Sequence, residues 1–136
     1  MSPAGLFKKL GAPLANVRWS WGAVRASDNV VFLRVWQDEG VKSGDKFIVQ
    51  LTHHARPRDE VDEMGHQERL KHIQLIRDGA RCYLLLCRAV DNNAVPRSAK
   101  SVIEREVFPT GEVQEIEGDI WIEMKTRVPI SDVLPA

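Results

Sequence analysis

The sequence lacks the features that mark a membrane or secreted protein. No apolar run approaches the roughly 20 residues that a membrane-spanning helix needs, and the longest is residues 83–87. The first ten residues have neither the apolar core nor the small-residue cleavage site of a signal peptide.

Cysteine is scarce: Cys82 and Cys87 are the only two. They lie five positions apart in one predicted strand, so they point to opposite faces and suit a reducing compartment as buried thiols. We therefore expect a cytoplasmic protein with no membrane partner.

The sequence also lacks net charge, because 19 Lys and Arg balance 19 Asp and Glu. This balance argues against a protein that coats nucleic acid by charge alone, since non-specific binding is mainly phosphate neutralisation. The charge is unevenly distributed, however. Residues 1–58 carry nine basic and four acidic side chains, and residues 59–136 carry ten and fifteen. A neutral total is therefore compatible with a basic face.

The hydrophobic pattern predicts a single domain, residues 1–136, of ordinary size. Apolar positions that alternate or run continuously predict strands, and a stripe at a spacing of three and four predicts a helix. The predicted helices are residues 3–10 and 65–78, and the predicted strands are residues 19–25, 30–37, 47–51, 81–90, part of 101–108, 113–116 and 120–127. Residues 40–44 are predicted as a turn. This order favours an α+β fold, with a mixed, mostly antiparallel curved sheet or small barrel and two or three helices.

Tryptophan supplies the first candidate site. Trp19, Trp21 and Trp36 lie on two predicted strands that should pair, so their rings are expected to cluster. Arg34 shares a strand face with Trp36, and Asp38 follows two positions on. Aromatic planes beside a guanidinium suit the stacking of an unpaired or flipped base. The alternative interpretation is that these rings belong to the core.

Two further groups of residues are candidate phosphate contacts. Arg69 falls on the apolar stripe of the helix at 65–78, where an unpaired charge is costly. It therefore needs an internal carboxylate or a bound anion as partner. The loop after residue 90 offers Arg97, Ser98 and Lys100 with no acid among residues 92–101, a composition suited to phosphate and sugar. That loop is otherwise an ordinary polar connection.

No motif in the sequence predicts a metal centre, a cofactor or an activated nucleophile. There is no His-Glu-x-x-His, no Cys-x-x-Cys, no Gly-x-Ser-x-Gly and no phosphate-cradling glycine loop. One enzymatic pattern is present, because Glu123 and Lys125 follow Asp119 and Glu115 in an order similar to the acid…Glu-x-Lys arrangement of metal-dependent nucleases. Glu-x-Lys is also common on solvated strand edges, and the upstream acid is closer than usual.

Residues 16–24, 31–38, 72–76 and 96–101 resemble the N-terminal portion of bacterial HNH restriction endonuclease-like proteins, and the resemblance extends over nearly the whole chain. In those proteins the N-terminal part is thought to sense DNA and a separate HNH part cuts it. This chain has no HNH core, so the resemblance implies a sensor that leaves cleavage to a separate nuclease partner. By analogy, the predicted strand order also resembles the PUA-like superfamily, including the EVE, ASCH and SRA domains, which bind modified bases or RNA.

The sequence hypothesis is a module, without its own nuclease centre or cofactor, that binds a modified or flipped base in DNA or RNA, with DNA the preferred partner. Trp19, Trp21 or Trp36 would stack on the base, and Arg34 with Asp38 would contact its edge. The phosphate contacts would come from Arg69, Arg97, Ser98 and Lys100. Two alternatives stay open: a small-ligand or protein-interaction domain, and a metal-dependent nuclease that uses Glu123 and Lys125.

Overall fold

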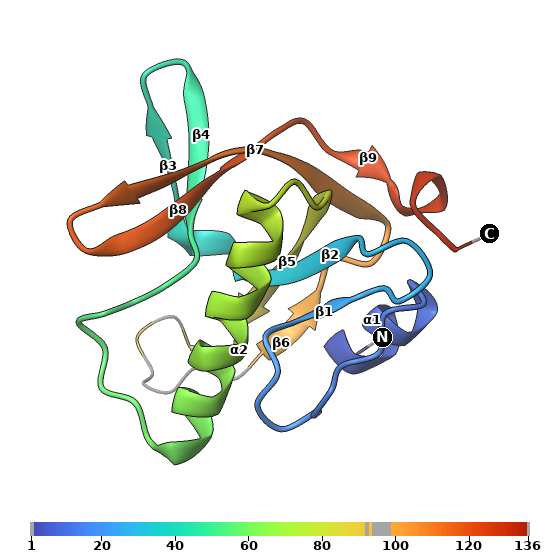
Figure 1. The fold of residues 1–136 in the computed structure, drawn as a ribbon, viewed down its shortest axis with the longest axis horizontal. Helices are drawn as coiled ribbons and strands as arrows, with labels where there is room; N and C mark the ends of the chain where they lie inside the picture. Colours follow the sequence, from blue (N-terminus) through green and yellow to red (C-terminus); the bar gives the residue numbers. More distant parts are fainter. Residues whose placement is uncertain (1, 92, 94–98, 136) are drawn as a thin grey trace.

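The computed structural model describes residues 2–91, 93 and 99–135. Within these ranges the chain forms two α-helices, two 3₁₀ turns and nine strands (Figure 1). In chain order they are α1 (Pro3–Lys9), β1 (Gly22–Val24), β2 (Val31–Trp36), η1 (Gln37–Glu39), β3 (Gly40–Ser43), β4 (Lys46–Gln50), α2 (Glu60–Arg77), β5 (Cys82–Ala89), β6 (Ala99–Val102), β7 (Glu106–Ile116), β8 (Asp119–Met124), β9 (Val128–Pro129) and η2 (Ile130–Asp132).

The strands form one open sheet in the order β1-β2-β5-β7-β8-β4-β3, with β6 paired to β5 and β9 paired to β7. Among the described strands only β2 and β5 run parallel, and the other pairs are antiparallel. The two ends of this order, β1 and β3, are not joined, so the sheet is not closed. The predicted α+β class with a mixed, mostly antiparallel sheet is confirmed, and of its two predicted shapes the curved sheet is the one formed.

Each face of the sheet carries its own hydrophobic core, because successive strand residues point to opposite sides. One core, here called the α1 face, gathers Phe32, Leu85 and Cys87 with residues of α1 and of the C-terminal segment. The other, here called the α2 face, gathers Leu33, Leu84 and residues of α2, β4 and β8. Figure 1 shows α2 lying across the sheet and α1 near both chain termini.

The central strand β5 confirms the clearest sequence prediction. Cys82 belongs to the core of the α2 face and Cys87 to that of the α1 face, so the two free thiols point to opposite sides of the sheet as predicted. Burial raises the pKa of the Cys82 thiol to about 12 and that of Cys87 to about 11. Both are therefore protonated, inert side chains at neutral pH.

Helix α2 begins five residues before its predicted start. The Asp59 side chain accepts a hydrogen bond of 2.8 Å from the Asp62 N–H, and Glu60, Asp62 and Glu63 occupy the first turn. Carboxylates near a helix N-terminus are stabilised by its dipole, so this acidic first turn favours the earlier start. No described helix is long and apolar enough to cross a membrane.

Two local predictions are wrong. Residues 19–25 were expected to form one strand, but only Gly22–Val24 does. The Ser20 N–H donates to the Asn16 carbonyl, and the Ser20 hydroxyl accepts from the Asn16 N–H. These two hydrogen bonds close a turn just before the strand. Gly40–Ser43 was expected to be a turn, yet it forms β3, and the turn lies at Gly44 and Asp45 between Ser43 and Lys46.

Candidate functional sites

The predicted pairing of Arg34 with Trp36 is present at the end of β2. The Arg34 Cζ lies 5.4 Å from the centroid of the indole ring. Both side chains are half-buried, and Trp36 packs against the core of the α1 face. Burial lowers the pKa of Arg34, but a guanidinium stays charged at neutral pH. A fixed cation beside an aromatic plane is a recurrent arrangement for holding a planar ligand.

The three predicted tryptophans do not cluster. The indole of Trp21 lies on the α2 face, with its edge against the backbone of Gly65 and its ring 5.7 Å from the Arg69 Cζ. Trp19 lies in the turn before β1, half-buried, with its carbonyl against Gly65. Trp36 is on the opposite face of the sheet. The expectation of one aromatic cluster is therefore wrong, because Trp19 and Trp21 both precede β1 and do not follow its strand pattern, while Trp36 faces the other core.

Arg69 is almost completely buried, with 4% of its surface exposed. Its guanidinium donates to three main-chain carbonyls, those of Arg34 at 2.7 Å, Trp21 at 3.0 Å and Leu51 at 3.1 Å. We predicted that Arg69 pairs with either a carboxylate or a bound anion. This prediction is wrong, because its partners are main-chain carbonyl oxygens. Burial and the nearby Arg34 charge lower the pKa of Arg69 to about 10, so it is still charged at neutral pH. Its single guanidinium therefore connects the strand ends of β1, β2 and β4. Little of the side chain is exposed to contact a phosphate.

Asp38 and the backbone of Lys100 lie toward the end of β2 that carries Trp36. Asp38 is exposed in η1, two positions after Trp36. Strand registers place Trp36 opposite Cys87, and Cys87 opposite Val102. The backbone of Lys100 in β6 is therefore two strands from this end, roughly 10 Å across the sheet. Arg97 and Ser98 lie outside the described residues.

Loop 52–58 follows β4 and is tied to the same region. The Glu39 carboxylate, with only 7% of its side chain exposed, accepts from His53 Nε2 at 2.9 Å and from the Arg56 guanidinium. Because Glu39 is adjacent to Asp38 in η1, these contacts hold the loop against the end of β2. The loop is therefore tied to η1, the segment that directly follows β2.

A second, unpredicted constellation centres on Asp119, which is 7% exposed at the start of β8. Its Oδ1 accepts from the Thr52 hydroxyl at 2.9 Å and the His54 N–H at 2.8 Å. Its Oδ2 accepts from His54 Nδ1 at 2.7 Å and Gln50 Nε2 at 3.2 Å. Burial acts to raise the pKa of Asp119, but the bonds from His54 and Thr52 outweigh it and the pKa is lowered. Asp119 is therefore an ionised carboxylate surrounded by donors.

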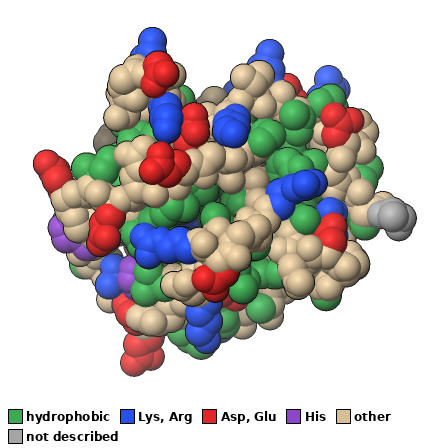
Figure 2. All heavy atoms as spheres, turned by 45° about the horizontal axis from the view of Figure 1, so that its top comes forward, with side chains coloured by type: hydrophobic (Ala, Val, Ile, Leu, Met, Phe, Trp, Pro, Cys, Tyr) green, Lys and Arg blue, Asp and Glu red, His purple; other side chains and the backbone are tan. Residues whose placement is uncertain are grey.

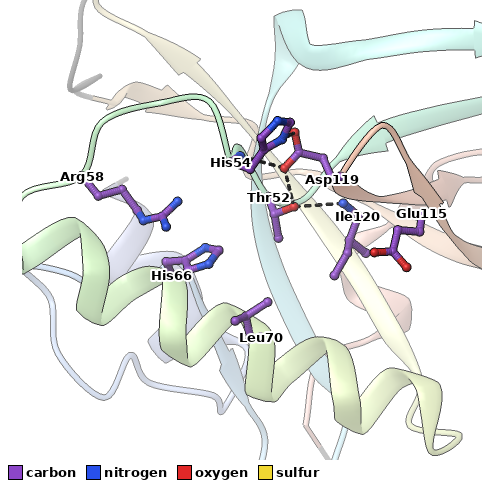
Figure 3. A pocket seen from close by; sticks show the side chains of 9 residues that line it. Thr52, His54, Arg58, His66, Leu70, Glu115, Asp119 and Ile120 are labelled. Carbon is purple, nitrogen blue, oxygen red and sulfur yellow. Dashed lines mark hydrogen bonds and ion pairs between the residues drawn. The ribbon is translucent and has the colours of Figure 1, made fainter.

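Next to this carboxylate lies a pocket of about 160 Å³ between α2 and the β7–β8 hairpin (Figure 3). Arg58 and His66 lie on one side of it, and His54 with Asp119 on the other, with Leu70 between them. The Nδ1 atom of His66 is buried and has no hydrogen-bond partner. Burial and the Arg58 charge lower the pKa of His66, so this imidazole is neutral at neutral pH.

One face of the molecule shows how the charges are distributed on it (Figure 2). The face drawn in Figure 2 carries acidic and basic side chains interspersed among apolar ones. Arg25, from the basic N-terminal half, is 6% exposed and donates to the carbonyls of Leu10 at 2.9 Å and Val133 at 2.7 Å. Its remaining donors bind the Asp28 carboxylate. This arginine therefore serves the fold rather than a ligand.

The residues of the nuclease alternative lie apart. Asp119 pairs with Ile116 at the tip of the hairpin, whereas Glu123 is four residues further along β8, opposite Ile48. At about 3.4 Å per residue this separates the two backbone positions by roughly 13 Å. Within the described residues no group of three or more His, Cys, Asp or Glu could hold a metal ion.

Sequence reasoning missed the site at Asp119, His54 and Thr52. Two local features of the sequence pointed to these residues. Thr52 and His54 are two positions apart, so they share one side of an extended segment. Asp119 follows Gly118 in a hairpin turn. However, His54 and Asp119 are 65 residues apart in sequence, and no short motif links them. No family model, curated protein or solved structure matches this chain.

Proposed function

We propose that this chain is a nucleic-acid-binding module that recognises a modified or flipped base in DNA or RNA, with DNA the preferred partner. Arg34 and Trp36 form the base-binding group, and Asp38 contacts the base edge. Any cleavage would be the task of a separate nuclease partner.

The Arg34–Trp36 stack is the observation that carries this proposal. A guanidinium donates in its own plane and stacks through its faces, so it can both read a base edge and lie against a ring. Asp38, two residues away, supplies an acceptor, and an arginine with a carboxylate together match a base edge that has donors and acceptors. Arg69 supports the arrangement because it fixes the Arg34 carbonyl at 2.7 Å.

The strand registers give further support. They bring β6, with Lys100, to the same end of the sheet as Trp36. A phosphate contact from this strand would lie beside the base-binding group. Arg97 and Ser98 stay candidate phosphate contacts, and Trp19, Trp21 and Arg69 become supports of the base-binding group rather than direct contacts.

The first experiment is binding to short single strands and duplexes, plain and base-modified, at low and at physiological salt. Trp36→Ala should weaken binding to the preferred modified strand by about 10- to 100-fold, because base–aromatic stacking contributes about 1–3 kcal/mol. Arg34→Lys should also weaken it, since lysine keeps the charge but loses the planar fork.

Trp121→Ala is the matched control. Trp121 is also half-buried, but it lies in β8 opposite Gln50 and Gln114. It should leave the preference for the modified strand unchanged. Equal losses on plain and modified strands in Trp36→Ala would contradict a base-specific site.

The internal use of Arg25 and the mixed charge in Figure 2 favour a second candidate, a small-ligand or protein-interaction domain. This candidate predicts no binding to any strand of the panel, even at low salt. Uniform, salt-sensitive binding would indicate phosphate contacts alone.

A further inference from the structure

The sheet divides where β7 passes from β5 to β8. Strand β7 pairs with β5 at Phe108 and Pro109, and from Thr110 onward it pairs with β8. At the point of division the Thr110 hydroxyl donates to the Cys82 carbonyl at 3.2 Å, so a side chain joins β5 to β7 there. The register of β7 against β8 shifts between Thr110 and Val113, and a bulge of this kind bends its strand. The start of β5 and the middle of β7 therefore diverge.

A pocket of about 340 Å³ lies where these strands diverge. Its lining comes from the end of α2 and the turn after it, the start of β5, the bulge of β7 and the residue that follows β8. Figure 1 shows the C-terminal end of α2 close to β7, in agreement with this lining. The volume lies within the roughly 300–1,000 Å³ of pockets that hold small molecules. The pocket is distinct from the one at Asp119, because the two share no lining residue.

The charged residues that line this pocket are Arg81 and Lys125, and both are basic. Both are exposed, and the part of the chain that the structure describes gives neither side chain an ion-pair partner. Other exposed cations differ in this respect, since Arg58 bonds Glu63 at 2.7 Å. The two positive charges at the pocket are therefore available to a ligand.

The acids that border the pocket are engaged elsewhere or lie outside its lining. Glu112 and Glu123 both lie beside the bulge of β7. Glu112 pairs with Lys46 at 3.3 Å, and the hydrogen bond from Glu112 and the charge of Glu123 both raise the pKa of Lys46. Asp78, at the end of α2, accepts from Gln74 Nε2 at 3.0 Å. No acid lines the pocket among the described residues, so its lining is positively charged.

Two cations from separate segments favour a ligand group with two negative charges. A phosphate monoester carries a charge of about −1.5 to −2 at neutral pH and has three acceptor oxygens, whereas a carboxylate carries one charge. The guanidinium of Arg81 can bind two oxygens at once, and the ammonium of Lys125 acts as a point charge. Ile76, Ala80 and Pro109 add apolar walls. These walls suit a compact organic group attached to the phosphate.

We infer that this pocket binds the phosphate monoester of a small organic ligand, with the phosphate between Arg81 and Lys125. The site goes beyond the proposed base-binding function and does not depend on it. Its lining includes Cys82 at the start of β5, whereas Trp36 is registered with Cys87 near the other end of that strand. Five residues of strand separate the two positions by roughly 17 Å.

The test uses three small probes: phenyl phosphate, phenyl sulfate and benzyl alcohol. Calorimetry should show that phenyl phosphate binds and that phenyl sulfate, which has a similar shape but one charge, binds about tenfold more weakly, because it loses part of a charge-assisted contact. Benzyl alcohol should not bind. In ¹⁵N NMR spectra the amide resonances of Gly79 and Gly111, which line the pocket, should shift with phenyl phosphate.

Substitution of each cation should remove the preference for two charges. Arg81→Gln and Lys125→Gln should each weaken the binding of phenyl phosphate about tenfold and reduce its advantage over phenyl sulfate. Arg77→Gln is the matched control, because Arg77 is an exposed cation in the last turn of α2 that does not line the pocket. It should leave both affinities unchanged. All three side chains are exposed, so the thermal midpoints of the variants should match that of the native chain.

The inference is overturned if phenyl phosphate does not bind, if it binds no better than phenyl sulfate, or if Arg77→Gln weakens it as much as Arg81→Gln does. A single strand with a 5′-phosphate, compared with the same strand ending in a 5′-hydroxyl, separates two sources of the monoester. A gain in affinity that is lost in Lys125→Gln supports the site with a strand end as its ligand. Binding of phenyl phosphate without that gain supports it with a free small molecule. Trp36→Ala should leave the affinity for phenyl phosphate unchanged, so failure of the base-binding proposal is measured separately.

Discussion

The two faces of the sheet each bury one arginine, and the two are held differently. On the α1 face Arg25 combines two carbonyls with the Asp28 carboxylate, whose side chain is 46% exposed. On the α2 face Arg69 bonds three carbonyls and no carboxylate. Arg25 therefore fastens the two terminal segments through the carbonyls of Leu10 and Val133, and its ion pair with Asp28 is open to solvent. Arg69 fixes strand ends from inside, and the Arg34–Trp36 pair and the His54 pocket both adjoin the strands that it holds.

The largest expected effect comes from Arg69→Met. Loss of the guanidinium removes three hydrogen bonds to buried carbonyls, each worth about 1–3 kcal/mol, although the Trp21 carbonyl keeps the Arg34 N–H as a donor. We expect a loss of about 3–5 kcal/mol in the free energy of unfolding. Arg25→Met leaves two carbonyls and an exposed acid, and should cost less, about 2–3 kcal/mol. Urea denaturation of both variants measures the difference. Equal losses would remove the distinction between the two faces.

Gly65→Ala tests how closely α2 approaches the chain before β1. An added Cβ would lie 2.5 Å from both the Trp19 carbonyl oxygen and the Trp21 ring. Alanine normally stabilises a helix interior by about 1 kcal/mol relative to glycine. Here we expect a net loss of about 1–3 kcal/mol from overpacking, measured as a lower urea midpoint. A gain in stability would show that this contact yields easily.

A fall in pH should lower the free energy of unfolding, because it protonates the buried His72 on the α2 face. Burial and the charge of Arg69 lower the pKa of His72 to about 4, below the ordinary value of about 6.5. The folded protein binds this proton less readily than the unfolded chain does. Stability is therefore retained above pH 6.5 and decreases as the pH falls toward 4, by about 2 kcal/mol at pH 5. Urea midpoints at pH 7 and pH 5 should converge in His72→Gln, and an unchanged pH dependence in that variant would exclude His72 as the cause.

The smallest expected change in stability comes from the turns of two hairpins, β1–β2 and β7–β8. Asn29 between β1 and β2 has φ 60°, and Glu117 between β7 and β8 has φ 51°. Asparagine tolerates positive φ better than glutamate. Glu117→Asn should raise the free energy of unfolding by about 0.5 kcal/mol, which a shift of the thermal midpoint detects. A decrease would indicate a contact of Glu117 that outweighs its backbone strain.

The sequence predicts what depends on short-range pattern. The apolar run of β5, the hairpin of β7 and β8, the opposed cysteines and the shared face of Arg34 and Trp36 all follow from residue spacing along a strand. The partners of Arg69 do not, because every residue has a carbonyl and no side-chain type reports which one is close. The bond between His54 and Asp119 was equally hidden, since it joins segments 65 residues apart that meet only when β4 pairs with β8.

The parallel pairing of β2 with β5 has a consequence for how the chain folds. Val31 in β2 is registered with Cys82 in β5, so the loop that must close between them contains η1, the β3–β4 hairpin and all of α2. Local hairpins form within microseconds, but a pairing across so many residues is opposed by chain entropy until most of them are ordered. Completion of the sheet by β2 and β5 should therefore be a late event, and it delivers Arg34 and Trp36 into position only when folding is nearly finished.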